Sequence, residues 1–274
     1  MWAEAGVFSR WIEGSAPPWP LGRGAALIAA EEDPAVDVDA SLGALDALAA
    51  GVEGWDRRAP LAERVERLVA GLAGAAGLRG DEDTYEDPAN SSLPAVLARR
   101  KGLPILLSVI YIEVGRRLGF ALDAVPFPGH FIVAPAEAEG RFFLDPFHGG
   151  QVIGADTLRA WAAQRNGGRP LDAAAWARAV APADARAVFI RMNLNLRAAH
   201  LRRDDPRRAA AASRRILALA PNDPGAALDF AQLVTAGGEP ALGEALLGAF
   251  LEAHPNHPSA ARLRAERRSP VGSA

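Results

Sequence analysis

The sequence predicts an α+β protein, in which a central helix on an antiparallel sheet lies between N-terminal helices and C-terminal all-α repeats. Apolar residues recur at helical spacing up to about residue 119. Short apolar and β-branched runs between Pro and Gly turns then indicate strands from 122 to 153. A 34-residue repetition marks the last third of the chain. We therefore divide the chain into an N-terminal helical segment (1–82), a core (83–182) and helical repeats (183–274).

The N-terminal segment is expected to hold three helices. Ala25–Glu32 is a short apolar helix that ends before Pro34, because a residue that precedes proline disfavours the helical conformation. Ser41 is the candidate N-cap of a second helix, which reaches about Gly51. A third helix begins after Pro60 and carries an apolar stripe opposite charged residues.

Two further helices lead into the predicted core. Asn90–Ser92 offers N-caps for a short helix at Leu93–Arg100. Pro104 suits the first turn of the next helix, where its missing N–H needs no partner. That helix, Ile105–Leu118, is apolar almost all round, so we expect it to be central. Glu113 is either a buried, hydrogen-bonded acid or the one exposed edge of the helix, and we favour the exposed edge.

The pattern then changes from helical to extended. Pro135–Gly140 is a polar connection of a length that joins two strands of a hairpin. Two helices follow the sheet, at Thr157–Ala163 and around Asp172–Ala179. The expected strands are Leu122–Phe127, His130–Ala134, Arg141–Asp145 and Gln151–Ile153.

The predicted hairpin brings a histidine to an aspartate. If Pro135–Gly140 closes it symmetrically, Ala134 lies opposite Arg141, and His130 lies opposite Asp145. Directly opposed side chains share a face, with Cβ atoms about 4.5–5.5 Å apart. A carboxylate that contacts an imidazole in this way orients a general base. We therefore expect His130 and Asp145 to form a pair.

The last third repeats a pattern of leucine, proline, asparagine and proline. Leu217–Pro224 and Leu251–Pro258 match at an offset of 34 residues. Such a period in a helical context resembles tetratricopeptide repeats, with Ala185–His200 and Pro206–Leu219 as the first helix pair. Repeats of this kind stack into concave surfaces that bind peptides or other proteins.

Composition excludes several classes of function. The chain has no cysteine, which rules out disulfides, thiolate metal sites, iron–sulfur clusters and a cysteine nucleophile. Thirty basic against thirty-three acidic residues give a net charge of −3, so the basic excess typical of nucleic-acid binding is missing. No phosphate-binding glycine loop is present, and we expect no cofactor and no nucleic-acid partner.

Location and metal binding follow from two further patterns. Residues 1–24 lack the unbroken apolar core of an export signal, and the longest apolar stretch, Leu103–Ile112, is about half a membrane span. We therefore expect a cytoplasmic protein without membrane contact. His254 and His257 are separated by Pro255, which breaks the helix that would align them, so we predict no metal site.

Several motifs resemble the SirB family of transglutaminase-like, tetratricopeptide-repeat-containing bacterial proteins. The most specific are Phe127–Phe131, which reads Phe-Pro-Gly-His-Phe, and Leu144–Gly150, which contains Asp-Pro-Phe. Asn90–Ile105, Ala25–Ala29 and Leu45–Ala49 are also similar to that family. The resemblance covers the chain from about residue 25 to its end and implies a transglutaminase-like, papain-like core.

The resemblance assigns catalytic roles to two residues and leaves a third role empty. It places His130 on the catalytic histidine of the superfamily and Asp145 on its catalytic aspartate. In active members a cysteine opens the central helix, whereas the matching stretch here, Gly102–Leu106, holds neither thiol nor hydroxyl. Ser108 is a weaker candidate nucleophile, because a serine inside a helix tends to bond a preceding carbonyl.

An orienting pair without a nucleophile does not transfer acyl groups. We therefore expect a catalytically inactive scaffold or regulator that binds a protein or peptide through its cleft and its repeats. The alternative is a hydrolase or acyltransferase that attacks amide or ester bonds with Ser108 or with a water activated by His130. In a third interpretation, the core is an inert support for the repeats. The residues expected to line the cleft are Asn90, Pro104, Gly129 and His148.

Overall fold

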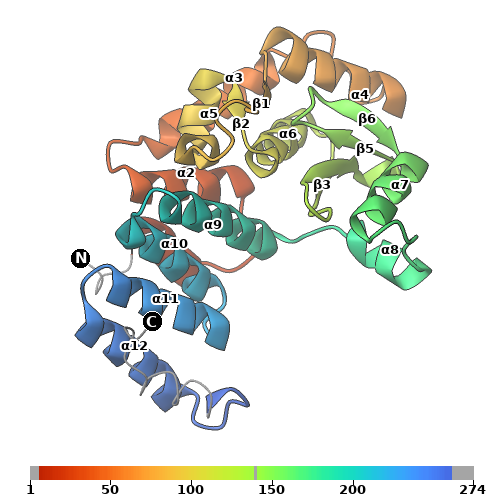
Figure 1. Cartoon of the computed structure of the whole chain (residues 1–274). Coiled ribbons are helices and arrows are strands. Elements are labelled where there is room, and N and C mark those ends of the chain that lie inside the picture. Colours follow the sequence, from red (N-terminus) through yellow and green to blue (C-terminus); the bar gives the residue numbers. More distant parts are fainter. Residues whose placement is uncertain (1–5, 139–140, 261–274) are drawn as a thin grey trace. The chain divides into compact units, whose positions relative to one another are not determined.

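The computed structural model describes residues 6–138 and 141–260 (Figure 1). The chain divides into two compact units. The continuous unit is Pro17–Val188, and the split unit combines Met1–Ala16 with Phe189–Ala274. The first helix therefore belongs with the last ones. The three-part division predicted from sequence pattern stays a prediction.

The continuous unit begins with the three predicted helices, but the second has a different cap. The Asp37 carboxylate accepts the Ala40 N–H at 3.0 Å, whereas Ser41 lies one turn inside the helix and donates its hydroxyl to the Asp37 carbonyl. Two cap-forming residues four positions apart left the helix start ambiguous in the sequence. The helices are α2 (Leu21–Glu32), α3 (Val38–Ala50) and α4 (Leu61–Val69), which continues as a π-helical segment at Ala70–Ala75.

The following segment carries a small parallel sheet and the central helix. Strands β1 (Arg79–Gly80) and β2 (Lys101–Gly102) pair in parallel. The chain between them forms a 3₁₀ turn (Pro88–Ser91) and α5 (Leu93–Arg99). Helix α6 (Pro104–Leu118) is buried along most of its length, as its apolar composition predicts, and ends at Gly119 with φ of +74°.

Glu113 corrects one expectation, because it is buried and not on an exposed edge of α6. Its carboxylate accepts the N–H of Gly22 in the first turn of α2 and pairs with Arg116 and Arg117 at 3.0 and 2.6 Å. Arg117 also binds Asp46 of α3. Burial alone would raise the pKa of Glu113, but the Gly22 N–H and the two guanidinium groups outweigh it and hold the pKa below its ordinary value. One carboxylate thus caps α2 and ties three helices together.

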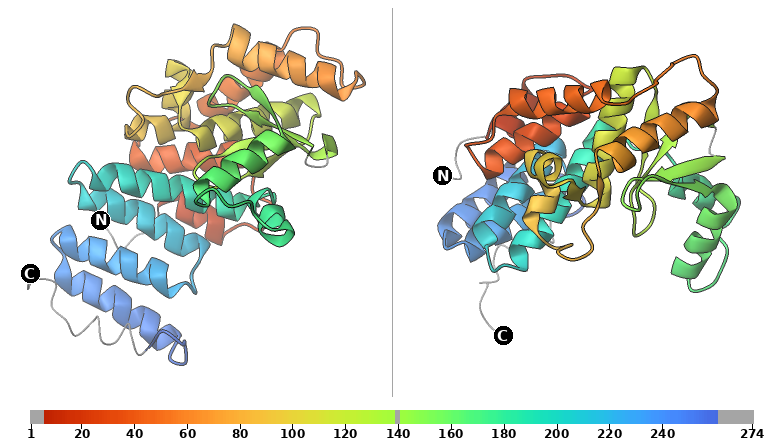
Figure 2. Two further views of the ribbon diagram at one scale, coloured as in Figure 1. Left: turned by 45° about the vertical axis from the view of Figure 1, so that its right-hand side comes forward. Right: turned by 90° about the horizontal axis from the view of Figure 1, so that it is seen from above.

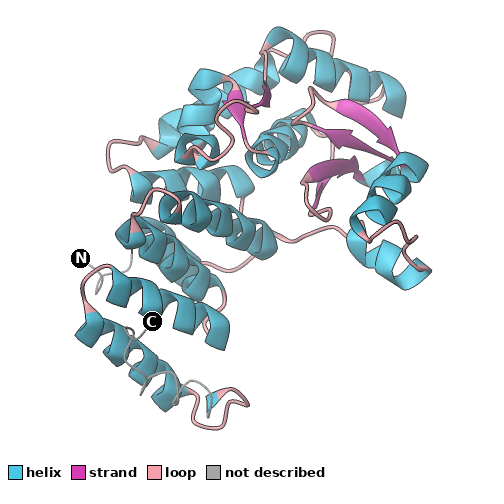
Figure 3. Ribbon diagram, viewed as in Figure 1, coloured by secondary structure: helices cyan, strands magenta, loops and turns pink. Residues whose placement is uncertain are grey.

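The main sheet is antiparallel and lies between helices. Helix α6 covers one face, and α7 (Ala155–Arg165) with α8 (Ala173–Ala179) covers the other (Figures 1 and 2). The strand order is β3-β4-β5-β6. Figure 3 draws the strands as magenta arrows. The strands are β3 (Leu122–Val125), β4 (Ile132–Pro135), β5 (Phe142–Asp145) and β6 (Gln151–Gly154).

The register of the predicted hairpin is shifted by two residues. Val133 pairs with Leu144, whereas symmetrical closure would place Val133 opposite Phe142. The reason lies in the connection, which continues from β4 into a 3₁₀ turn (Ala136–Ala138) and so is not symmetrical. Residues 139 and 140 lie outside the described ranges. Because side chains alternate along a strand, a shift of two leaves every residue on its predicted face.

The split unit is helical. Helix α1 (Val7–Glu13), which the sequence analysis did not predict, packs with its Phe8 ring edge-on to Phe189 at 5.5 Å. Helices α10 to α12 pack each on the next, and α10 and α12 begin at Pro206 and Pro240, 34 residues apart. In the described ranges no helix is long and apolar enough to cross a membrane. The other helices are α9 (Ala185–Leu201), which crosses the unit boundary, α10 (Pro206–Leu219), α11 (Pro224–Ala236) and α12 (Pro240–Ala253).

Candidate functional site

His130 stands at the end of a tight turn just before β4. Its backbone N–H donates to the Phe127 carbonyl at 2.9 Å. Gly129 has φ of +71°, a left-handed conformation that glycine adopts at little cost. A Cβ at Gly129 would also lie 3.0 Å from the Arg165 Nε. The Pro-Gly-His motif is therefore a turn. Because of it, β3 ends at Val125, before the predicted Phe127, and β4 begins at Ile132, after the predicted His130.

Asp145 is the last residue of β5, and its carboxylate is completely buried. Its Oδ2 lies 2.7 Å from His130 Nε2 and 2.7 Å from His148 Nδ1. Its Oδ1 accepts the backbone N–H groups of Phe147 and His148 at 3.1 and 3.3 Å. The predicted contact between His130 and Asp145 is present, and His148 joins it. We call His130, Asp145 and His148 the HDH cluster.

The charge of Asp145 is stabilised by its neighbours. Burial would raise the pKa of this carboxyl, but the hydrogen bonds and charges of His130 and then His148 lower it, and the result lies below the ordinary value. An ionised carboxylate only accepts hydrogen bonds. The ring nitrogens that face it, His130 Nε2 and His148 Nδ1, are therefore the donors. In the neutral form of each ring, the opposite nitrogen presents a lone pair.

Tyr85, Phe147 and the cluster's own His148 form an aromatic rim beside His130. The Phe147 ring is 5.9 Å from Tyr85, 6.2 Å from His130 and 5.1 Å from His148, centroid to centroid. The side chain of His148 is 49% exposed and that of His130 is 11% exposed, and Tyr85 is 48% exposed as a residue. A ligand therefore meets Tyr85 and His148 first, with His130 behind them.

The start of α6 offers no nucleophile to this cluster. Leu103, Pro104 and Ile105 are all buried and carry neither thiol nor hydroxyl. Ser108 is fully buried, and its hydroxyl donates to the Phe131 carbonyl at 3.4 Å. Ser108 is thus engaged inside the helix packing and is not presented to solvent.

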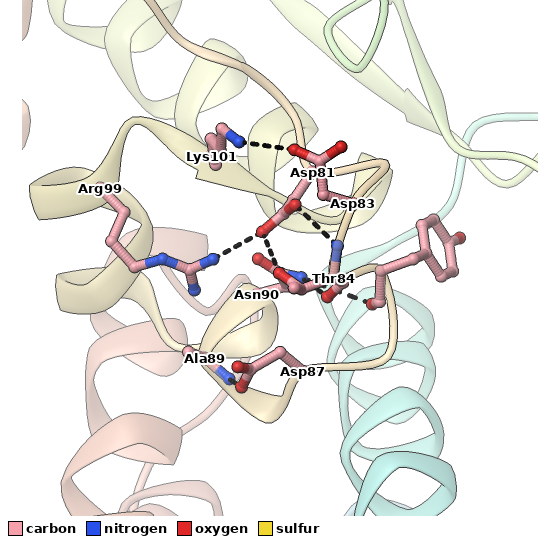
Figure 4. Close-up of polar contacts among 9 residues, drawn as sticks. Asp81, Asp83, Thr84, Asp87, Ala89, Asn90, Arg99 and Lys101 are labelled. Carbon is pink, nitrogen blue, oxygen red and sulfur yellow. Dashed lines mark hydrogen bonds and ion pairs between the residues drawn. The ribbon is translucent and has the colours of Figure 1, made fainter.

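Asn90 is fully buried and holds the loop that carries Tyr85 (Figure 4). Its side-chain amide donates to the Thr84 carbonyl at 2.6 Å, and its backbone carbonyl accepts the Leu103 N–H at the start of α6. Asp81 accepts the Thr84 hydroxyl at 2.7 Å and the Arg99 guanidinium at 2.6 Å (Figure 4). These bonds fix the loop against α5 and α6. The cleft-lining roles predicted for Asn90, Pro104, Gly129 and His148 stay predictions.

Sequence reasoning missed two features of the site. The first is the contact of His148 with Asp145, although Asp145-Pro146 is a typical turn start whose carboxylate accepts backbone N–H groups two and three residues on. The second is Tyr111 of α6, whose hydroxyl is buried without a hydrogen-bond partner and whose pKa is raised by burial and, next, by the charge of Asp145. An aromatic residue in an apolar helix carries no sequence signal for such a position.

The HDH cluster has the composition of a metal site. One donor atom from each residue lies within 4.8 Å of the other two. Within residues 6–138 and 141–260, this is the one group of three histidine or carboxylate side chains close enough to share an ion. His254 and His257, the pair considered from the sequence, pack beside Phe250 and belong to no such group.

A pocket of about 590 Å³ lies elsewhere in the continuous unit, between α3 and α5. Its walls are mostly alanine and leucine side chains, with Asp33, Asp37 and Arg100 among the polar lining residues. No member of the HDH cluster lines it. The pocket and the HDH cluster therefore occupy different places in the continuous unit.

Comparison with known proteins gives a family and several relatives. A family model described as the transglutaminase-like superfamily matches residues 39–193. A UPF0162 protein of Xylella fastidiosa is 44% identical over 153 residues, which are 56% of this chain and 54% of that protein. A UPF0162 protein of Pseudomonas aeruginosa is 31% identical over 205 residues, 74% of this chain and 73% of that protein.

A shorter match reaches a mammalian protein. F-box only protein 21 of mouse is 36% identical over 69 residues, 25% of this chain and 11% of that protein. The chain spans about half the length of the Xylella relatives that it matches. No solved structure shows a significant match.

Proposed function

Because the chain belongs to the transglutaminase-like superfamily, together with the UPF0162 proteins, we propose that it is a SirB-type member that has lost acyl transfer and binds a protein or peptide. The start of α6 is the observation that carries this proposal. The orienting pair His130–Asp145 is intact at 2.7 Å, yet Leu103-Pro104-Ile105 provides no atom to attack a carbonyl.

Covalent acyl transfer needs a nucleophile within hydrogen-bond reach of the base that activates it. Ser108 is the one hydroxyl on α6 outside its tyrosine, and it is buried with its proton directed to the Phe131 carbonyl. Exposing it would require moving the packed second turn of α6. We therefore set the serine mechanism aside and retain the cluster as a binding element.

The aromatic rim is the proposed contact surface for the peptide. Tyr85 and His148 are about half exposed, and Phe147 supports both rings from behind. Aromatic side chains with one polar end give large contact area and a hydrogen bond together. The Asp81–Arg99 and Asn90–Thr84 bonds hold the Tyr85 loop in place before binding, which lowers the entropy cost of association.

The C-terminal helices are the second proposed contact surface. We propose that α10 to α12 form tetratricopeptide-like repeats. The 34-residue spacing of their proline starts, Pro206 and Pro240, supports this, as does the spacing of Pro224 and Pro258. The stacking of α10, α11 and α12 is also what such repeats need.

Peptide binding can be tested by selecting binders from a random displayed peptide library on the full chain. We expect Tyr85→Ala and His148→Ala each to lower the affinity for the selected peptides at least about tenfold, because half-exposed aromatic anchors dominate such contacts. Val152→Ala, at a 55% exposed apolar residue of β6, is the matched control and should bind as the wild type does. Equal affinity of all four proteins would refute the proposed surface.

Catalytic inactivity is tested separately with panels of amide, ester and peptide substrates. We expect wild type and His130→Ala to give the same background rate, because neither has a nucleophile. Turnover by the wild type that disappears in His130→Ala would overturn the non-catalytic proposal.

One observation favours a second candidate, a hydrolase that uses water. Asp145 holds His130 Nε2–H, which leaves the Nδ1 lone pair as a potential general base. A water at that nitrogen would replace the missing side-chain nucleophile. The same substrate panel decides between the two candidates, since water-based hydrolysis survives Ser108→Ala and is lost in His130→Ala.

A further inference from the structure

We propose that the HDH cluster binds one divalent transition-metal ion, such as Zn²⁺. The cluster combines two imidazoles with one carboxylate, and its donor atoms converge within 4.8 Å. This inference goes beyond peptide binding and does not depend on it, because it concerns the three side chains alone and is tested with the metal alone.

The geometry needs a small rearrangement of the three donor atoms, which now lie within 4.8 Å of one another. Zinc binds imidazole nitrogen and carboxylate oxygen at about 2.0–2.2 Å in a tetrahedral arrangement, which separates neighbouring ligand atoms by roughly 3.3–3.5 Å. His130 Nε2 and His148 Nδ1 now lie 2.7 Å from Asp145 Oδ2. Each contact must therefore lengthen by about 0.6–0.8 Å. His148 is half exposed and can supply much of that movement by a side-chain rotation.

The carboxylate is already oriented as a single-oxygen ligand. The N–H groups of Phe147 and His148 hold Oδ1 at 3.1 and 3.3 Å, so Oδ2 is the atom that remains for an ion. Outer bonds of this kind orient metal ligands and contribute to affinity. Asp145 is completely buried in β5, which gives the site a rigid base.

Proton positions change without any net loss of protons from neutral imidazoles. At present each ring donates an N–H to Asp145, so coordination through the same nitrogen requires the other tautomer. His130 then carries its proton on Nδ1, and His148 carries its proton on Nε2. Three protein ligands leave a fourth position for water, on the side of the half-exposed His148.

The donor set selects among metals. Two nitrogens and one oxygen without a thiolate suit Zn²⁺, Co²⁺ or Fe²⁺, whereas Mg²⁺ and Ca²⁺ prefer oxygen ligands only. Copper(I) and iron–sulfur clusters prefer sulfur, and the chain has no cysteine.

Titration of the chelator-treated full chain with ZnCl₂, followed by calorimetry, tests the site. We expect one ion per chain and a loss of affinity of at least about tenfold in both His148→Ala and His130→Ala, because each removes one of three ligands. The double variant His254→Ala/His257→Ala is the matched control, since it removes two histidines outside the cluster, and it should bind as the wild type does.

A second readout guards against loss of folding. Co²⁺ added to the same proteins should give the visible absorption of a four-coordinate ion in wild type and in the control, and not in His148→Ala. Because His148 is half exposed, that variant should keep the circular dichroism of the wild type, although the lost hydrogen bond to Asp145 lowers its melting temperature. Two results would overturn the proposal. One is no stoichiometric Zn²⁺ binding by folded wild-type protein, and the other is binding that persists in both cluster variants. Peptide binding measured in chelator is unaffected by either result.

Discussion

Asp145 satisfies a buried negative charge with two imidazoles and two backbone N–H groups. Each hydrogen bond to a charged group contributes about 1.5–3 kcal/mol, and a buried polar group left without its partner costs a comparable amount. The carboxylate therefore stabilises the turn after β5 as well as the two histidines. This gives the pair a structural reason to be present even where no acyl transfer takes place.

Asp145→Ala should lower the free energy of unfolding by about 3 kcal/mol or more, because it leaves four donors without their acceptor. Urea denaturation measures this. Asp156→Ala, an exposed carboxylate on α7, should change stability by less than about 1 kcal/mol. Similar small losses in the two variants would show that the cluster is not a stabilising element.

Glu113 makes stability depend on pH in acid. Its pKa is depressed in the folded protein, so its contribution to stability is complete above the unfolded-state value of about 4.5 and is lost as the pH falls through the lower folded value. We expect Glu113→Gln to be less stable than wild type at pH 7 and the difference to shrink below about pH 4.5. Chemical denaturation across pH 3–7 measures this. Glu66→Gln, at an exposed position, is the control. If its stability difference from wild type changed with pH in the same way, the assignment to Glu113 would be wrong.

Single residues were predictable from sequence only where a turn or a pairing rule fixes them. The contact between His130 and Asp145 follows from two strands and one loop, and it survives the shift in register because the shift is two residues. Glu113 could not be placed, since Gly22, whose N–H its carboxylate accepts, lies on another helix, α2. Its burial depends on tertiary packing that one helix pattern does not contain.

The two-residue strands β1 and β2 connect the Tyr85 loop to the cluster. Gly80 N–H donates to the Phe147 carbonyl at 2.8 Å, and a Cβ at Gly80 would lie 2.5 Å from the Phe147 ring. The backbone can approach the ring this closely only because residue 80 has no side chain. The short parallel sheet is therefore a support for the aromatic rim.

Gly80→Ala should lower the free energy of unfolding by about 1–3 kcal/mol, because the added methyl group displaces Phe147. It should also lower the affinity of ligands for the aromatic rim. Gly43→Ala is the matched control in α3, where nothing lies within 4 Å of the added Cβ, and it should raise stability by about 0.5–1 kcal/mol. Thermal melting of both variants measures the contrast, and a Gly80→Ala protein as stable as wild type would contradict the proposed support.

Elements were predicted better than their ends. Every helix and strand expected between residues 25 and 219 is present, because apolar period and Pro or Gly stops are local signals. Their ends differ where two signals compete, as at Asp37 and Ser41, or where a turn replaces extended chain, as at His130. The hairpin register depends on the backbone of its connection, which composition does not specify.

The division of the whole chain depends on α1. Phe8 is completely buried and packs on Phe189, so a helix from the first residues completes the helical unit at the other end of the chain. A seven-residue helix gives too short a pattern to be recognised from sequence. A boundary drawn along the sequence alone therefore misses this partner, and a fragment that starts near residue 183 would lack it.

Phe8→Ala should lower the stability of the split unit by about 3–5 kcal/mol through loss of a buried aromatic ring. Hydrogen exchange should become faster in α10 and α11 and stay unchanged in α6. Val7→Ala, which is 38% exposed, is the neighbouring control and should leave exchange nearly unchanged. Faster exchange in α6 to the same extent would show that the two units unfold as one.

The split of one unit around the other also sets an order of events during synthesis on the ribosome. Helix α1 is made before the continuous unit, and its partner Phe189 follows only after the whole of Pro17–Val188, about 170 residues later. At about 5–20 residues per second this is a delay of roughly 10 to 30 s. The continuous unit can complete its fold in that interval. During it, the apolar face of α1, with Phe8 and Ile12, has not yet packed against the helices that bury it. Helix α1 thus leaves the ribosome well before the residues that bury it.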